Sequence, residues 1–311
     1  MREALQFYID GRWVAPRKSR VIDVIDPADA GIAGRVALGD ASDVDDAVMA
    51  ARRAFDGFSR SSVRERAELL DAIIAVYTKR SGDLAGAVTA EMGAPMWLAS
   101  GAQVPIGIAH FQVARQLLDD YDFTEVRGAT LLAKEPVGVC GFITPWNWPL
   151  NQIACKVAPA LAVGCTMVLK PSEVAPFTGH IFAEIMAEAG VPAGVFNLVH
   201  GDGPGVGAAL SSHPQVDMVS FTGSTRAGVE VARAAAPTVK RVHQELGGKS
   251  ANIVLPSADL RAAVAGGVDA MMVNSGQSCN APSRMLLPAA RMDEAKTIAA
   301  EAAAANTVGT P

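Results

Sequence analysis

Residues 136–149, PVGVCGFITPWNWP, decide the fold class, because the apolar run 137–144 leads into a rigid turn with prolines and tryptophans. Short β-rich runs follow at 166–169, 195–199, 217–221 and 251–255, and helical stretches such as 177–189 lie between most of them. Strands that alternate with helices predict βαβ units. We therefore expect an α/β fold with a doubly wound parallel sheet, which binds ligands at the carboxyl ends of its strands.

Upstream of this pattern the sequence predicts a hairpin and then a helical region. Residues 7–9 and 12–14 flank the dipeptide Asp10-Gly11, which suits a type I′ turn. Residues 42–118 carry the apolar spacing of amphipathic helices. Residues 119–135 fit neither region, and we interpret them as a pair of strands that leaves the domain body.

Two helix starts can be assigned within the helical region. Ser42 and Ser62 each stand before an apolar face and have an acid three residues on, Asp45 and Glu65 respectively. This is the capping-box pattern, in which the hydroxyl and the acid exchange hydrogen bonds with backbone N–H groups. Helices are therefore expected to begin at both serines.

The composition is that of an ordinary globular protein, with 50% apolar residues, 19% charged residues and a net charge of −5 at pH 7. These values exclude disordered, collagen-like and coiled-coil chains. The acidic balance argues against a nucleic-acid partner. We expect no membrane span, because no apolar run approaches about 18 residues, and no signal peptide, because residues 1–11 contain no apolar h-region. The 4 cysteines and 5 histidines lack disulfide-framework and metal-ligand spacing, which favours a reducing cytoplasm and no metal site.

Two segments at predicted strand ends carry polar groups. Asn147 follows the strand 137–143, where its amide could donate to a developing oxyanion or merely satisfy its own loop. Lys170 and Glu173 follow the strand 166–169. Their ammonium and carboxylate could face the two hydroxyls of a ribose, and the carboxylate would disfavour a 2′-phosphate. The alternative is a solvated ion pair.

Two further segments complete the set. At Gly223-Ser224 a strand ends and a helix begins, which offers N–H groups to a pyrophosphate, although the same residues make an ordinary helix cap. Glu245 begins the block Glu-Leu-Gly-Gly-Lys, and Cys279 ends the block Gly-Gln-Ser-Cys. A thiol nucleophile with a carboxylate base is a pattern of covalent catalysis, although a lone cysteine is more often structural.

In this order and at these separations, the four segments resemble the NAD(P)-dependent aldehyde dehydrogenase superfamily. The resemblance runs through essentially the whole chain and is strongest over 136–283. Its most specific part is the pair of blocks that contain Glu245 and Cys279. It implies that Cys279 attacks the aldehyde carbon, that Asn147 and the Cys279 N–H form the oxyanion hole, and that Glu245 activates water. Lys156 matches a family lysine near the path of that water.

The resemblance also implies the binding residues. Those for NAD, with NADP as a weaker alternative, are Ile143, Thr144, Pro145, Trp146, Lys170, Ser172, Glu173, Gly203, Gly223, Ser224 and Leu246. The substrate tunnel would be lined by Trp148, Gln152, Cys155 and Ser278, the first three on one helix face. Because the residues at 152 and 155 are not bulky, a medium-to-large aldehyde is expected. The alternative is that this face packs the core.

The same resemblance divides the chain into parts with different roles. Residues 1–118 and 137–247 would form the NAD-binding domain, 119–136 a small β segment for oligomerisation, and 248–311 the start of a second α/β catalytic domain. Family members are longer, so we expect this domain to be incomplete here and the parent enzyme to be a homodimer or homotetramer. Two alternatives remain open: a CoA-acylating relative, although these tend to lack a base at the Glu245 position, and a non-catalytic nucleotide-binding fragment.

Overall fold

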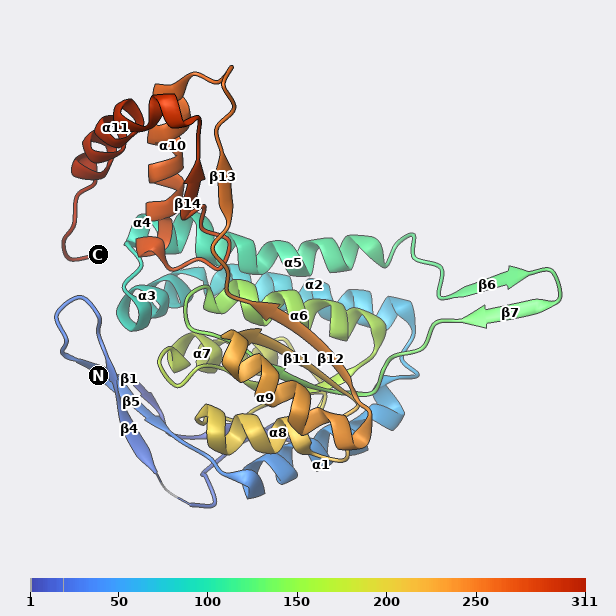
Figure 1. Cartoon of the computed structure of the whole chain (residues 1–311). Coiled ribbons are helices and arrows are strands. Elements are labelled where there is room, and N and C mark those ends of the chain that lie inside the picture. Colours follow the sequence, from blue (N-terminus) through green and yellow to red (C-terminus); the bar gives the residue numbers. More distant parts are fainter. Residues whose placement is uncertain (1, 19) are drawn as a thin grey trace. The chain divides into compact units, whose positions relative to one another are not determined.

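A seven-stranded sheet organises the first of the two units into which the chain divides (Figure 1), one running to Glu245 and the other covering Leu246–Pro311. The computed structural model describes residues 2–18 and 20–311. The strand order of the sheet is β12-β11-β8-β9-β10-β2-β3. The bounds are β2 Phe7–Ile9, β3 Arg12–Val14, β8 Val139–Ile143, β9 Thr166–Lys170, β10 Phe196–Leu198, β11 Met218–Gly223 and β12 Arg241–Leu246.

The middle of this sheet is parallel, as the alternation of strands and helices predicted. β11 pairs with β8, β8 with β9 and β9 with β10, each in parallel register. Every residue of β8 and β9 is buried, which explains why these strands read as unbroken apolar runs rather than alternating ones. The predicted doubly wound α/β fold is therefore confirmed.

Two groups of helices cover the sheet. The first contains α2 (Val63–Lys79), α5 (Val104–Leu117), α6 (Pro149–Val163) and α7 (Pro176–Glu188), which contact one another. The second contains α1 (Ala41–Phe58), α8 (Ala208–Ser212) and α9 (Thr225–Ala235). Both α1 and α6 pack on β8 and β9, as covering helices of a doubly wound sheet do.

The expected helical region is present, but one helix start was assigned to the wrong residue. Helix α2 begins as predicted, with Ser62 accepting from the Glu65 N–H at 3.1 Å. Helix α1 is capped by Asp40 instead of Ser42, and Asp43 completes the box by accepting from the Asp40 N–H at 2.9 Å. Both residue types make good caps, so the pattern alone could not choose between starts two residues apart. The region also contains α3 (Ser81–Met92), α4 (Met96–Leu98) and a π-helical turn, η1 (Ala99–Gln103).

The amino-terminal part is richer in strands than predicted. The hairpin is confirmed: β2 and β3 pair in antiparallel register, and Asp10 and Gly11 have φ of 53° and 75°, as a type I′ turn requires. The sequence did not reveal a separate three-stranded sheet with the order β1-β5-β4. Its strands are β1 Arg2–Ala4, β4 Val21–Ile25 and β5 Ile32–Ala37.

A two-stranded ribbon occupies the segment that fitted neither region. β6 (Thr124–Arg127) and β7 (Thr130–Ala133) pair only with each other, and all of their residues are exposed. The ribbon projects away from the helices of its unit (Figure 1). The pair of strands leaving the domain body is thus present.

The second unit contains two helices and a short parallel sheet. β13 (Ala251–Ile253) pairs with β14 (Arg284–Leu286), and α10 (Leu260–Met272) packs against α11 (Met292–Ala305). The small core consists of Val254, Leu260, Val264, Ala295 and Ile298. Within the described part of the chain, no helix is both long enough and apolar enough to cross a membrane.

Candidate active site

Three of the predicted site segments leave the sheet at the same edge, together with the segment after β10 that leads to Gly203. In the parallel register Ile143 stands beside both Lys170 and Phe221, and Leu198 beside Leu169. The carboxyl ends of β10, β9, β8 and β11 are therefore neighbours. After β8, the chain adds β9 and β10 on one side of β8 and then adds β11 on the other side. Open α/β sheets bind ligands at such a switch in strand order.

The segment after β8 joins this edge to the helices. The Thr144 N–H donates to the Lys170 carbonyl at 3.1 Å. Thr144 Oγ1 is buried and has no hydrogen-bond partner among residues 2–18 and 20–311. Pro145 and Asn147 are half-buried, and Trp146 is exposed. The Asn147 carbonyl accepts from Gln103 Nε2 at 3.4 Å, so η1 supports the turn from behind.

Lys170 and Glu173 form an ion pair in which the lysine is buried and the carboxylate is partly exposed. Lys170 Nζ lies 2.8 Å from Glu173 Oε2, with side chains 4% and 31% exposed respectively. The interpretation as a surface pair is therefore wrong for Lys170. Ser172 is also buried, and its Oγ accepts from the Val174 N–H at 3.2 Å. The partly exposed carboxylate is the half of the pair that can meet a ligand.

The segments that follow β11 and β10 have small side chains at the predicted site positions, so there they offer a ligand mainly backbone groups rather than charged side chains. Ser224 caps α9, accepting from the Ala227 N–H at 3.3 Å, which is the alternative role considered for it. A Cβ on Gly223 would lie 2.5 Å from the tip of the Phe221 ring, so a larger residue where β11 turns would have to displace that ring. Gly203 is exposed at the start of the π-helical turn Gly203–Gly207.

Lys156 ties α6 to the end of β11. Its ammonium is buried and donates to Thr222 Oγ1 at 2.8 Å. Burial lowers the pKa of Lys156, opposed by Cys155 and Glu245. Burial also raises the pKa of the Cys155 thiol, with Lys156 lowering it and Glu245 raising it again. The charge of Glu245, whose side chain is 60% exposed, therefore acts on the pKa values of both Cys155 and Lys156.

The predicted substrate face on α6 is half-buried throughout. Trp148, Gln152 and Cys155 are each neither fully buried nor exposed, and the Cys155 thiol donates to the Gln152 carbonyl at 3.5 Å. Cys155 also lines a mainly apolar groove of about 570 Å³ between α5 and α6, whereas Trp148 and Gln152 do not. Trp148 packs against the main core, so the alternative that this face packs the core stays open beside the tunnel.

In the second unit, Cys279 is exposed, while Cys140 and Cys165 of the first unit are buried. A Cβ on Gly248 would lie 3.5 Å from the Cys279 carbonyl oxygen, so the glycine block and the cysteine block meet within this unit. Ser278 and Leu246 are half-buried. The turn before the cysteine contains three successive residues with positive φ, which are Asn274, Ser275 and Gly276.

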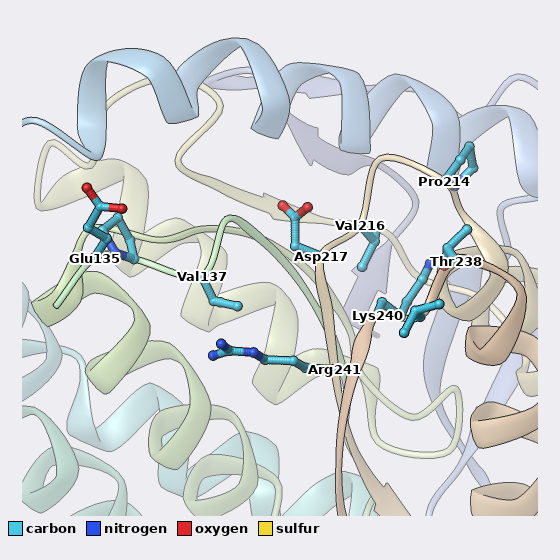
Figure 2. Close-up of a pocket in the computed structure, with 10 residues that line it drawn as sticks. Glu135, Val137, Pro214, Val216, Asp217, Thr238, Lys240 and Arg241 are labelled. Atoms are coloured by element: carbon cyan, nitrogen blue, oxygen red, sulfur yellow. The ribbon is translucent and has the colours of Figure 1, made fainter. Parts of the chain in front are cut away.

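A hollow of about 460 Å³ lies at the opposite edge of the large sheet, where β8, β11 and β12 begin (Figure 2). None of the predicted site residues lines it. Its charged wall has a structural use: Asp217 Oδ2 accepts from the Val139 N–H at 2.7 Å and from Arg52 at 2.5 Å. Among the described residues, no group of three His, Cys, Asp or Glu side chains could hold a metal ion.

Comparisons with known proteins bear directly on these segments. Residues 13–311 match the profile of the Aldehyde dehydrogenase family. The chain belongs to this family. The resemblance carried by the four segments is thereby confirmed.

Individual relatives are similar over nearly the whole of this chain. The 3-succinoylsemialdehyde-pyridine dehydrogenase of a Pseudomonas species is 59% identical over 100% of this chain and 65% of the relative. A cysteine-to-alanine mutant of aldehyde dehydrogenase C from Pseudomonas syringae, solved with NAD⁺ and octanal, is 52% identical with a TM-score of 0.98, over 99% of this chain and 64% of that one. Betaine aldehyde dehydrogenase from Staphylococcus aureus, solved with NAD⁺, is 34% identical with a TM-score of 0.95, over 99% and 62%. The chain thus spans about 65% of the length of the curated relative.

Proposed function

We propose that the protein oxidises an aldehyde to a carboxylate with NAD⁺ and water. The observation that carries this proposal is that the segments with Asn147, with Lys170 and Glu173, and with Gly223 and Ser224 meet at the carboxyl edge of the parallel sheet. Membership of the aldehyde dehydrogenase family supports it, as do the two similar structures solved with NAD⁺.

The residues at this edge fit the proposed cofactor. The Lys170–Glu173 pair offers a donor and an acceptor to a ribose diol. The orphaned hydroxyl of Thr144 leaves a polar contact for a ligand to complete. Ile143, Pro145, Trp146, Ser172, Gly203, Gly223, Ser224 and Leu246 would complete the NAD site. NAD⁺ supplies the hydride acceptor when bound, and the carboxylate of Glu173 disfavours NADP.

The chain's own residues account for the remaining steps. Cys279 adds to the aldehyde carbon as a thiolate, and the resulting oxyanion accepts from Asn147 and from the Cys279 N–H. Loss of hydride leaves a thioester on Cys279. Glu245 then takes a proton from water as the water attacks that thioester. Lys156, fixed by Thr222, holds the α6 side of this path.

The two units would divide the work. The first would bind NAD⁺, with the ribbon β6–β7 serving in oligomerisation, and the second would carry the nucleophile. We place the protein in the cytoplasm as a homodimer or homotetramer, without a nucleic-acid or membrane partner. The free thiols of all four cysteines are consistent with a reducing compartment.

The half-buried face of α6 favours a medium-to-large aldehyde. Cys155 is small and borders an apolar groove, so an acyl chain or ring there would gain about 0.8 kcal/mol for each CH₂ buried. The name of the 59% identical relative, a semialdehyde-pyridine dehydrogenase, describes a substrate of this size. We propose Trp148, Gln152, Cys155 and Ser278 as the lining of the substrate tunnel.

One assay tests the proposal. NADH absorbance is followed with a medium-length aldehyde, with and without CoA, in the protein and in Cys279→Ala. The proposal expects turnover without CoA and none in the variant. A strict requirement for CoA would assign the acyl group to a thiol acceptor instead. Binding of NADH without any turnover, in protein that contains every segment of its relatives, would favour a nucleotide-binding module.

A further inference from the structure

Glu91 is a buried carboxylate near the end of α3 whose hydrogen bonds all go to another helix. Only 1% of the residue is exposed. One carboxylate oxygen accepts from the Phe177 N–H at 2.6 Å, and the other accepts from the Thr178 N–H at 3.0 Å and from the Thr178 hydroxyl. Phe177 and Thr178 belong to the first turn of α7.

This contact replaces a cap that α7 lacks. The N-cap position is Ala175, which has no side-chain acceptor. The first N–H groups of a helix have no partner within the helix, and Glu91 takes two of them while placing negative charge at the positive end of the helix dipole. Burial raises the pKa of Glu91 to about 7, while the three donors of α7 and the charge of Arg2 lower it. Glu91 thus caps α7 from a neighbouring helix.

The start of α7 is mechanically coupled to the loop 171–175, which we name the cofactor loop. This loop joins β9 to α7 and carries Ser172 and Glu173. Its first residue, Pro171, packs directly on α7, because a Cβ on Gly179 would lie 2.8 Å from Pro171 Cγ. A shift of the first turn of α7 would therefore move the loop from both of its ends.

We propose that Glu91 is a positioning residue for the cofactor loop, holding Glu173 in place for the ribose by capping α7 from α3. The inference rests on the proposed function, since it assumes that the cofactor loop binds NAD. Glu91 itself is buried away from any ligand, so its effect passes through α7. Removing its charge should weaken nucleotide binding without changing the chemistry at Cys279.

The main test is the NADH dissociation constant, measured by fluorescence titration in the wild-type chain and in Glu91→Gln at about pH 8.5, well above the pKa of about 7, so that the wild-type carboxylate is ionised. We expect the dissociation constant to rise roughly tenfold. Loss of a helix cap has about this effect on the NADH-bound state, in which the start of α7 must stay in place. Asp43→Asn is the matched control: Asp43, in α1, is 2% exposed and accepts from the N–H groups of Arg17 and of Asp40, the residue before the helix. It should lower thermal stability and leave NADH affinity unchanged.

A rescue separates positioning from general damage. Adding Ala175→Ser to Glu91→Gln gives α7 a cap of its own, and it should restore most of the lost affinity. Gly179→Ala should weaken NADH binding by displacing Pro171, without touching any charge. Equal affinity in wild type and Glu91→Gln, or an equal loss in Asp43→Asn, would overturn the inference.

Hydrogen exchange distinguishes failure of this inference from failure of the proposed function. In the absence of nucleotide, the amides of Val174, Phe177 and Thr178 should exchange faster in Glu91→Gln than in wild type. Unchanged exchange would overturn the positioning role, whether or not NADH binds. If exchange accelerates but the wild-type protein binds no NADH, the capping role of Glu91 is supported and the proposed cofactor site is refuted.

Discussion

Replacing Glu173 by glutamine tests whether the Lys170–Glu173 pair selects between NAD and NADP. The two side chains meet at 2.8 Å, and only the carboxylate is substantially exposed, at 31% against 4%. A ribose 2′-hydroxyl can donate to that carboxylate, whereas a 2′-phosphate cannot and adds like charge. A hydrogen bond to a charged group contributes about 1.5–3 kcal/mol, so wild type should prefer NADH over NADPH by roughly tenfold to a hundredfold.

The substitution should act on both nucleotides in opposite directions. Glutamine still accepts from the 2′-hydroxyl, but a neutral hydrogen bond is worth only about 1 kcal/mol, so NADH affinity should fall by roughly threefold to tenfold. Lys170 keeps its charge and loses its partner, and opposite charges about 4 Å apart near a protein surface attract by about 4 kcal/mol before desolvation is counted. NADPH affinity should therefore rise, and the preference should shrink to near unity.

Fluorescence titrations of NADH and NADPH measure this preference directly. Glu125→Gln removes the same charge from an ion pair on β6, where Glu125 Oε1 lies 2.7 Å from Arg127, and it should leave both affinities unchanged. A Glu173→Gln variant with the wild-type ratio of the two dissociation constants would refute the reasoning. So would a wild-type protein that binds both nucleotides equally.

Three further predictions follow from the other parts of the site. In protein that contains the complete catalytic domain, Cys279→Ala should show no NADH production, while Glu245→Gln should show a burst of NADH and then slow turnover; a linear trace without a burst in Glu245→Gln would contradict the role of this base. Cys155→Trp should lower kcat/KM for a long-chain aldehyde by more than tenfold, roughly the loss of two buried CH₂ groups, and spare acetaldehyde, so an equal response of both substrates would remove this residue from the tunnel. The pKa of Asp40 is lowered to about 2 by its hydrogen bonds to Ser42 and Lys18, so its stabilising effect should persist above pH 3.8 and be lost as the pH falls toward about 2. The melting temperature of Asp40→Asn should accordingly fall less over that range, and identical melting curves at each pH would exclude this contribution.

The parallel sheet and its edge were predictable because the sequence carries them locally. Each buried strand reads as a short apolar run, and the residues that follow it must appear at the carboxyl edge once the strands are parallel. The hairpin was equally accessible, since Asp10-Gly11 has few conformations other than a tight turn. This argument pointed to Asn147, Lys170, Glu173, Gly223 and Ser224, and the family resemblance added the other predicted site residues of the first unit.

What could not be predicted depends on partners distant in the chain. β12 escaped notice because its residues alternate between exposed and half-buried, and the exposed ones include Arg241 and Glu245, so no apolar run marks it. The role of Glu91 was equally hidden. No neighbouring residue in the sequence indicates that Glu91 accepts hydrogen bonds from a distant helix. The N–H groups that it satisfies belong to residues 86 and 87 positions further along. Such pairings need the folded geometry.

The amino-terminal hairpin lies at one edge of the large sheet and pairs there with β10, so during synthesis it can pair only after β10 has been made. The Asp10 N–H donates to Asn197 Oδ1, 187 residues away, and Tyr8 pairs with Leu198 on β10. A ribosome that adds about 5–20 residues each second needs roughly ten to forty seconds to supply that partner. For that interval Tyr8, which ends at 5% exposure, lacks its partner on β10. The hairpin strands β2 and β3 can therefore join the large sheet only after β10 has left the ribosome.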